Sequence, residues 1–271
     1  MPAWLDDWMM SGVDALYERL PAAQPTREQL MSVQVISHRG ERDNAAVFEN
    51  TYAAFDPLRG SGVHGLEFDV RWTRDLAPVV FHDEDFLRLH GDPTRIADLS
   101  LADLRARRPE IPLLEEFVRR YAHEFHLMCE LKFESYPDPA RQGARLAEAL
   151  APALTRGRCT VLSLVSEMFG WLPAIPASAT MLVVRVDSAY ASRDALKHKR
   201  HGFSTHYARL AVGQIRRHHD VGQKLGCGFP ASPKMFQREV ARGVDYVFTN
   251  VALKAEGWRR QLLAQVADKK K

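Results

Sequence analysis

Two histidines and three carboxylates stand at the ends of β-rich runs in this 271-residue chain. The set is His38, His82, Glu67, Asp69 and Glu130. Imidazoles can move protons, and three acidic oxygen ligands can hold a hard cation. Two basic side chains beside them, Arg39 and Lys132, can neutralise a bound phosphate. Metal-assisted cleavage of a phosphodiester requires this combination of residue types.

The spacing of the acidic residues groups them on one side of the strands. Residues two apart in a strand face the same side, so Glu67 and Asp69 project together, as do Glu130 and Lys132. Buried carboxylates are costly unless they are paired or bound to a metal. Because all the ligands offer oxygen, the site favours Mg²⁺ or Ca²⁺ over zinc.

Nine β-rich runs alternate with helical stretches, which indicates a parallel sheet with helical crossovers. The runs are Val33 to His38, His64 to Val70, Ala77 to His82, Leu127 to Leu131, Cys159 to Leu164, Met181 to Val186, Gly202 to His206, Lys224 to Phe229 and Val244 to Thr249. The Ala77 to His82 run follows a tight turn, so it should return antiparallel, as a hairpin arm.

The eight remaining runs match a (β/α)₈ TIM-type barrel, whose strand ends gather the candidate residues at one face. The expected fold is this α/β barrel with an N-terminal helix and a short insertion after the second-strand hairpin. An open doubly wound sheet is the alternative, but no Gly-x-Gly-x-x-Gly follows the first run. We expect a helical extension over residues 1–30, the barrel over 31–255, and a C-terminal helix with a basic tail over 256–271.

Composition excludes several classes of protein. A net charge of +3 gives little support to nucleic-acid binding. The odd number and wide spacing of the three cysteines argue against a disulfide framework or a zinc site, and their apolar strand-like runs predict buried free thiols. No apolar run reaches the roughly 18 residues of a membrane span, and the first 20 residues lack a secretory signal. We therefore expect a cytoplasmic protein with no stable membrane insertion.

The first residues read as an amphipathic helix. Trp4, Trp8 and Leu16 would pack on the body of the protein or on the second subunit of a homodimer.

The order of the motifs resembles the glycerophosphodiester phosphodiesterase family. The chain has His38-Arg39-Gly40, Glu49-Asn50-Thr51, Glu67-Phe68-Asp69, His82-Asp83 and Glu130-Leu131-Lys132. The run from Gly243 to Asn250 also resembles the family's last strand. The match covers roughly Val33 to Ala252 and is most specific in its first hundred residues.

The resemblance implies a (β/α)₈ barrel that hydrolyses small-molecule glycerophosphodiesters to glycerol 3-phosphate and an alcohol, with Mg²⁺ or Ca²⁺ as cofactor. It assigns metal ligation to Glu67, Asp69 and Glu130, and acid–base work to the two histidines, His38 and His82. It also implies that Arg39 contacts the phosphate, that Glu49 supports Arg39 or the metal, and that Lys132 faces the phosphate.

Three departures from the family pattern bear on the substrate. Phe48 replaces the proline that usually precedes Glu-Asn-Thr, and the insertion after His-Asp is short, which leaves a more open mouth. Gly228 stands where a tryptophan is expected to wall the alcohol pocket. Phe229 or Tyr207 would partly replace that tryptophan.

Alternatives remain open. The same barrel would serve a lysophospholipase D-like enzyme or a sugar-phosphodiester hydrolase, and a catalytically silent binding barrel is the alternative from another class. Outside the motifs, we expect His218 and His219 at the surface, and Asn250 as a turn cap rather than a site residue.

Overall fold

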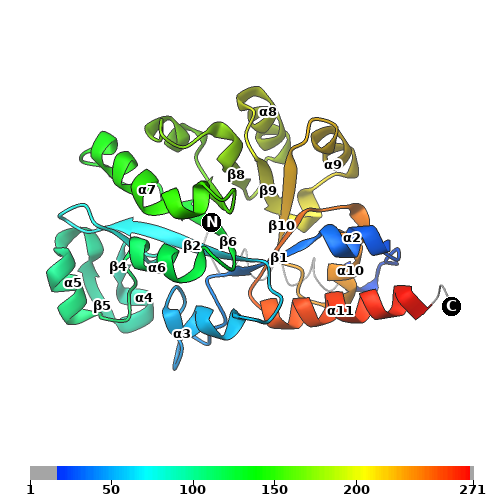
Figure 1. The fold of residues 1–271 in the computed structure, drawn as a ribbon, viewed down its shortest axis with the longest axis horizontal. Coiled ribbons are helices and arrows are strands. Elements are labelled where there is room, and N and C mark those ends of the chain that lie inside the picture. The colour runs from blue at the N-terminus through cyan, green and yellow to red at the C-terminus, as the bar shows by residue number, and fades with distance from the viewer. Residues whose placement is uncertain (1–16, 269–271) are drawn as a thin grey trace.

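The computed structural model describes residues 17–268, and in it eight parallel strands close into a barrel surrounded by helices (Figure 1). The strands pair in the order β1-β11-β10-β9-β8-β7-β6-β2, and β2 pairs again with β1. They are β1 (Gln34–His38), β2 (Gly65–Trp72), β6 (His126–Leu131), β7 (Cys159–Ser163), β8 (Thr180–Val184), β9 (Gly202–His206), β10 (Lys224–Gly228) and β11 (Tyr246–Thr249). The expected TIM-type barrel is therefore confirmed.

The hairpin arm also takes the expected form. Strand β3 (Pro78–Val80) runs antiparallel to the far end of β2, with Val70 opposite Val80. This arm extends β2 beyond the barrel wall and carries His82 back toward the strand ends.

Most of the helices cover the outside of the barrel, whereas α4 (Leu87–His90) and α5 (Leu101–Arg107) belong to the insertion beside it (Figure 1). In chain order, the described helices are α2 (Arg27–Ser32), α3 (Tyr52–Phe55), α4, α5, α6 (Leu114–Tyr121), α7 (Pro139–Leu154), α8 (Ser188–His198), α9 (Val212–His219), α10 (Pro233–Arg242) and α11 (Ala252–Asp268). Short 3₁₀ turns join them: η1 (Asp56–Leu58), η2 (Ile96–Asp98), η3 (Ser166–Trp171), η4 (Ala177–Ala179) and η5 (Tyr207–Arg209). The helix expected around Trp4, Trp8 and Leu16 lies outside the described residues, as do Lys269, Lys270 and Lys271.

Apolar side chains form two layers about the strands. The barrel interior is filled by a small cluster of six: Ile36, Met128, Leu162, Met181, Tyr246 and Phe248. A much larger cluster lies between the outer faces of the strands and the helices, and includes Phe68, Phe117 and Leu182. Because side chains alternate sides along a strand, the same strands supply both layers.

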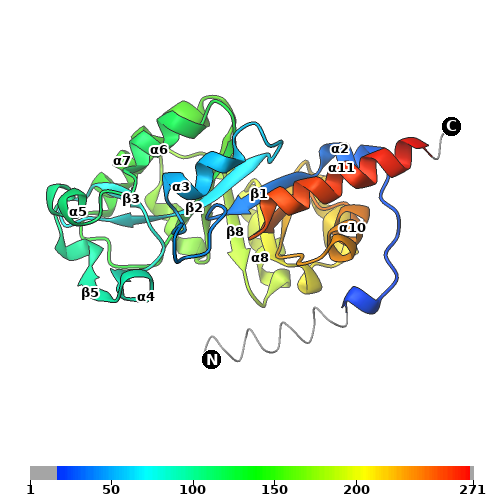
Figure 2. The same ribbon diagram turned by 90° about the horizontal axis from the view of Figure 1, so that it is seen from below.

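The insertion after the hairpin arm has a core of its own. Strands β4 (Asp85–Phe86) and β5 (Asp92–Arg95), which the sequence did not predict, pair with each other apart from the barrel. Its buried residues are Val79, Phe81, Phe86, Ile96, Leu104 and Ile111. The insertion lies on the side of the molecule away from α11 (Figures 1 and 2).

Some surface and burial expectations can be compared with the structure. All three cysteines are free and buried, as expected. His218 was expected at the surface and is instead fully buried, with its ring nitrogens bonded to Ser192 and Gln223. The helical pattern alone did not reveal that α9 turns this side chain inward. Within residues 17–268, no helix combines the length and the apolar character needed to cross a bilayer.

Candidate active site

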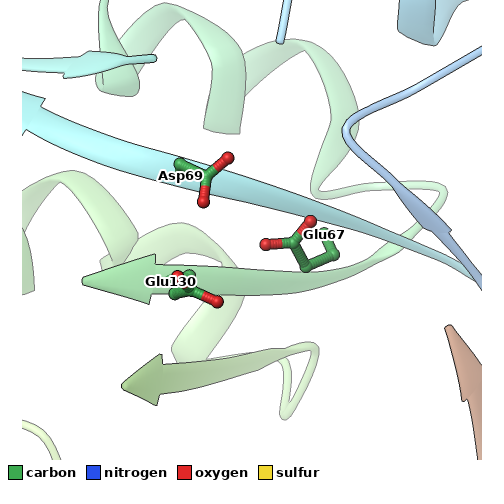
Figure 3. A group of neighbouring side chains, drawn as sticks. All are labelled: Glu67, Asp69 and Glu130. Carbon is green, nitrogen blue, oxygen red and sulfur yellow. The ribbon is translucent and has the colours of Figure 1, made fainter. Parts of the chain in front are cut away.

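Strand register brings the expected residues together at the carboxyl ends of the strands. His38, the last residue of β1, lies opposite Glu67 on β2. Two residues further along β2, Asp69 lies opposite Glu130 on β6. Two neighbouring strand pairs thus set a histidine and three carboxylates side by side, and Figure 3 shows the three carboxylates on β2 and β6.

The three carboxylates are close enough to share a cation. Glu67, Asp69 and Glu130 each offer an oxygen, and these atoms lie within 4.8 Å of one another. Both oxygens of Glu67 are buried and have no hydrogen-bond partner among the described residues. An unpaired buried carboxylate is costly, so this donor set fits a hard divalent cation.

The charges around the cluster are unequally distributed. The Lys132 ammonium lies 2.5 Å from Asp69 Oδ1 and also bonds Glu130, and Arg39 Nε lies 3.0 Å from Asp69 Oδ2. The pKa of Asp69 is therefore lowered despite its burial, by Lys132 and Arg39. Burial and the charges of Asp69 and Glu130 raise the pKa of Glu67 well above its usual value. A bound cation would therefore stabilise the ionised form of Glu67 more than that of Asp69, which already contacts Lys132 and Arg39.

His38 is held by a neutral amide. Its Nδ1 lies 2.8 Å from Oδ1 of Asn250, the residue after β11. Arg42 donates to the same Oδ1 at 2.9 Å, which fixes this atom as an acceptor. Nδ1 of His38 must therefore carry a proton, so that in the neutral ring the lone pair is on Nε2, 3.7 Å from Glu67. Burial and the nearby Arg39 lower the pKa of His38 to about 3, so the ring is neutral.

His82 is held by an anionic partner instead. Its Nδ1 lies 2.6 Å from Oδ1 of Asp83, and the other oxygen of Asp83 accepts from Arg88 Nε at 2.6 Å. The two histidines therefore differ in the group that faces Nδ1: a carboxylate oxygen for His82 and an amide oxygen for His38.

The loop after β1 explains why its motif contains glycine. Arg39 and Gly40 both have positive φ, at 61° and 84°. A Cβ on Gly40 would lie 2.6 Å from Cβ of Ala54, so a larger residue does not fit. This tight exit lets α3 approach the strand end, and Thr51 caps that helix by accepting from Ala54 N.

The Glu-Asn-Thr motif supports the site from the same loop. Glu49 is buried and pairs with Arg39 at 3.2 Å and Arg88 at 2.5 Å. These two arginines lower the pKa of Glu49 to about 2 despite its burial. Asn50 donates to Asp69 Oδ2 at 2.9 Å. Glu49 thus supports Arg39, one of the two roles expected for it.

The two aromatic residues expected near the alcohol differ in exposure. Phe229 is 40% exposed, and its ring meets that of His38 edge-on at 4.8 Å. Tyr207 is fully buried and packs edge-on against Tyr17. The structure therefore leaves Phe229 accessible at the mouth, whereas Tyr207 contributes to packing.

Sequence reasoning gave no role to several polar residues that complete the site. Asn250 was expected to cap a turn, and Asn50 and Asp83 appeared only as motif neighbours. The closing of the barrel, which places β11 beside β1, could have indicated Asn250. Arg42 and Arg88 carried no sequence signal, because arginines in loops are common and their partners lie on other segments.

Comparisons with known proteins agree with this geometry. Residues 38–251 match the model of the glycerophosphoryl diester phosphodiesterase family. YhdW of Bacillus subtilis is 26% identical over 241 residues, which cover 80% of this chain and 93% of that protein. The glycerophosphodiester phosphodiesterase GDPD2 of Arabidopsis thaliana is 32% identical over 111 residues, and that alignment spans only 29% of the plant protein.

Solved structures share the fold. A phosphodiesterase from Oleispira antarctica, solved with the product sn-glycerol-3-phosphate, superposes with a TM-score of 0.70 at 23% identity. The match covers 84% of this chain and 97% of that one. The Thermotoga maritima glycerophosphodiester phosphodiesterase gives a TM-score of 0.65 at 23% identity, over 84% of this chain and 98% of that one.

Proposed function

This chain belongs to the glycerophosphoryl diester phosphodiesterase family, and on that premise we propose that it hydrolyses glycerophosphodiesters to glycerol 3-phosphate and an alcohol. The observation that carries the proposal is the placement of an unpaired, buried Glu67 with Asp69 and Glu130 beside a histidine held by a neutral partner. The family and the hydrolase class expected from the sequence are both confirmed.

In this proposal Glu67, Asp69 and Glu130 hold Mg²⁺ or Ca²⁺. Such a cation, when bound, supplies positive charge to a nonbridging phosphate oxygen as negative charge develops there. Lys132 and Arg39 add fixed positive charge at the same place, because both already lie against Asp69. Arg39, with its planar fork of donors, is the residue we assign to the phosphate oxygens.

His38 acts as the base. Its Nδ1 proton is committed to Asn250, so the lone pair of Nε2 is available beside Glu67. That nitrogen accepts the proton of the attacking hydroxyl, from either a water molecule or the substrate glycerol. Asn250 and Arg42 keep the ring in the tautomer that this step requires.

His82 acts as the acid. The carboxylate of Asp83 holds its Nδ1, and Arg88 holds Asp83 in place. Its Nε2 proton passes to the oxygen of the departing alcohol.

Release of glycerol 3-phosphate from glycerophosphocholine and glycerophosphoethanolamine tests the proposal, with Mg²⁺, with Ca²⁺ or with chelator. We expect metal-dependent release that disappears in Glu67→Ala and falls by about 10²–10⁴-fold in His38→Ala. His123→Ala, at an exposed histidine away from the strand ends, serves as the matched control. A wild-type protein that cleaves no diester under any of these conditions would favour the silent barrel.

A substrate whose leaving group needs no proton can distinguish the role of His38 from that of His82. A 4-nitrophenyl diester of glycerol 3-phosphate releases a stable phenolate that needs no proton. His82→Ala should therefore recover most of its lost rate on this substrate, whereas His38→Ala should not. Equal losses on both substrates would contradict the assignment. The homodimer and the cytoplasmic location expected from the sequence stay predictions.

A further inference from the structure

A cavity of about 580 Å³ adjoins the proposed acid and has no role so far. It lies between the start of the insertion and the loop that follows β6, with Asp83 and Arg88 on one side and Phe133 to Ser135 on the other. Arg71, another wall residue, donates from Nε to the backbone oxygen of His82 at 2.9 Å. His82 is thus tied to this wall twice, through its Nδ1 contact with Asp83 and its backbone bond to Arg71.

The walls of the cavity are strongly polar. Three arginines and four carboxylates line it, and Leu87 and Phe133 are the apolar side chains that the described part of the chain adds. Most of the charges are paired: Arg71 with Glu134 at 2.8 Å, and Arg95 with Glu84 at 3.0 Å. Such a wall offers hydrogen-bond donors and acceptors together, with opposite charges that largely offset each other. Among the described residues, its apolar surface is limited to Leu87 and Phe133, which is little for an acyl chain.

One acceptor in the wall lacks a partner. Oε2 of Glu134 accepts from Arg71, but Oε1 is buried and has no hydrogen-bond partner among the described residues. A buried acceptor without a partner is destabilising, so a ligand hydroxyl that donates to it is favoured. Nearby, Phe133 is 71% exposed, and its ring offers a flat face to the C–H groups of a ring alcohol.

We propose that this cavity receives the leaving alcohol, and that the alcohol is a compact polyol whose hydroxyl donates to Glu134 Oε1. A polyol both donates and accepts hydrogen bonds, which suits the mixed wall of arginines and carboxylates. A trimethylammonium alcohol has no donor for Glu134, and a lysophospholipid would bring an acyl chain to a charged wall. The inference rests on the proposed function, since it names the substrate class of the same site.

The test compares four diesters of glycerol 3-phosphate, whose alcohols are inositol, glycerol, choline and 4-nitrophenol. Wild-type kcat/KM should be at least about tenfold higher for the inositol diester than for the choline diester. Glu134→Gln should lower kcat/KM for the inositol diester about tenfold more than for the 4-nitrophenyl diester. Glu124→Gln is the matched control, because it alters an Arg-paired carboxylate outside the cavity and should leave the ratio unchanged.

A second variant tests the inference independently, in case Glu134→Gln folds poorly. Phe133→Ala changes an exposed side chain, and it should lower kcat/KM more for the inositol diester than for the glycerol diester, which has no ring to pack against Phe133. If the wild type prefers the choline diester, or if both variants affect every diester equally, the polyol inference is wrong but the proposed function still stands. If the wild type cleaves none of the four, the proposed function itself fails.

Discussion

Replacing Glu67 by glutamine should make the metal-free protein more stable while removing its response to metal. Glu67 is 2% exposed, and neither of its oxygens has a hydrogen-bond partner among the described residues. Leaving a buried acceptor unsatisfied costs about 1–3 kcal/mol, and more when the group is charged. Glutamine keeps the shape, is neutral without taking up a proton, and can donate to the neighbouring carboxylates. In chelator, Glu67→Gln should therefore be more stable than the wild type by about 1–3 kcal/mol.

Metal should reverse that order. At about 100 times its Kd, Mg²⁺ stabilises the folded wild type by about 2.7 kcal/mol, because it binds only the folded state. For a protein of this size that corresponds to a rise in Tm of about 5–10 °C. Glu67→Gln lacks one of the three carboxylates proposed to hold the metal, so its Tm should change little when Mg²⁺ is added.

Thermal and urea unfolding in chelator and in excess Mg²⁺ measure both effects. Glu256→Gln is the matched control: Glu256 is also 2% exposed, but its oxygens pair with Arg259 and Arg260. That variant should lose stability in both conditions and keep the full response to Mg²⁺. The reasoning is refuted if Glu67→Gln is less stable than the wild type in chelator, or if it gains as much from Mg²⁺.

Three further outcomes follow from the site and its loops. Asn250→Asp places a carboxylate beside His38 and should raise the pKa of that ring. The acidic limb of the kcat/KM–pH profile should therefore move to higher pH. A limb that does not move counts against His38 as the base. Gly40→Ala should cost about 2–4 kcal/mol in urea unfolding, whereas Gly60→Ala, with positive φ but open space around it, should cost about 1 kcal/mol. Because the pKa of Glu49 is lowered from 4.5 to about 2, its stabilisation is present above pH 4.5 and is lost as the pH falls toward 2; Glu49→Gln should flatten that part of the stability–pH curve.

The barrel could be predicted because its strands carry strong local patterns. The buried runs of β2, β6 and β10 are bounded by turns, and their expected ends lie within two residues of the observed ones. The hairpin arm followed from the shortness of its turn. The paired strands β4 and β5 were missed because each is very short and lies in a polar stretch, where periodicity gives no signal.

The candidate site was predictable in its residues but less so in its contacts. The cluster of Glu67, Asp69 and Glu130 came from a period of two within strands together with the parallel order of β2 and β6. Lys132 was expected to face a phosphate, and its contacts with Asp69 and Glu130, where it offsets their repulsion, were not foreseen. Such pairings depend on which segments meet in space, so no local pattern could reveal them.

Because the insertion has a small core of its own, its sequence and length can change without disturbing the barrel. Phe86, Ile96 and Leu104 pack with one another and with the hairpin arm, and not with the barrel interior. The segment can therefore be exchanged or lengthened while the strands that hold the carboxylates keep their register. Arg88 is the constraint on such an exchange, because it links Asp83 of the insertion to Glu49 of the barrel loop. An insertion taken from a related protein, if it keeps this arginine, should change which alcohol is preferred. The carboxylates on β2 and β6 would keep their positions.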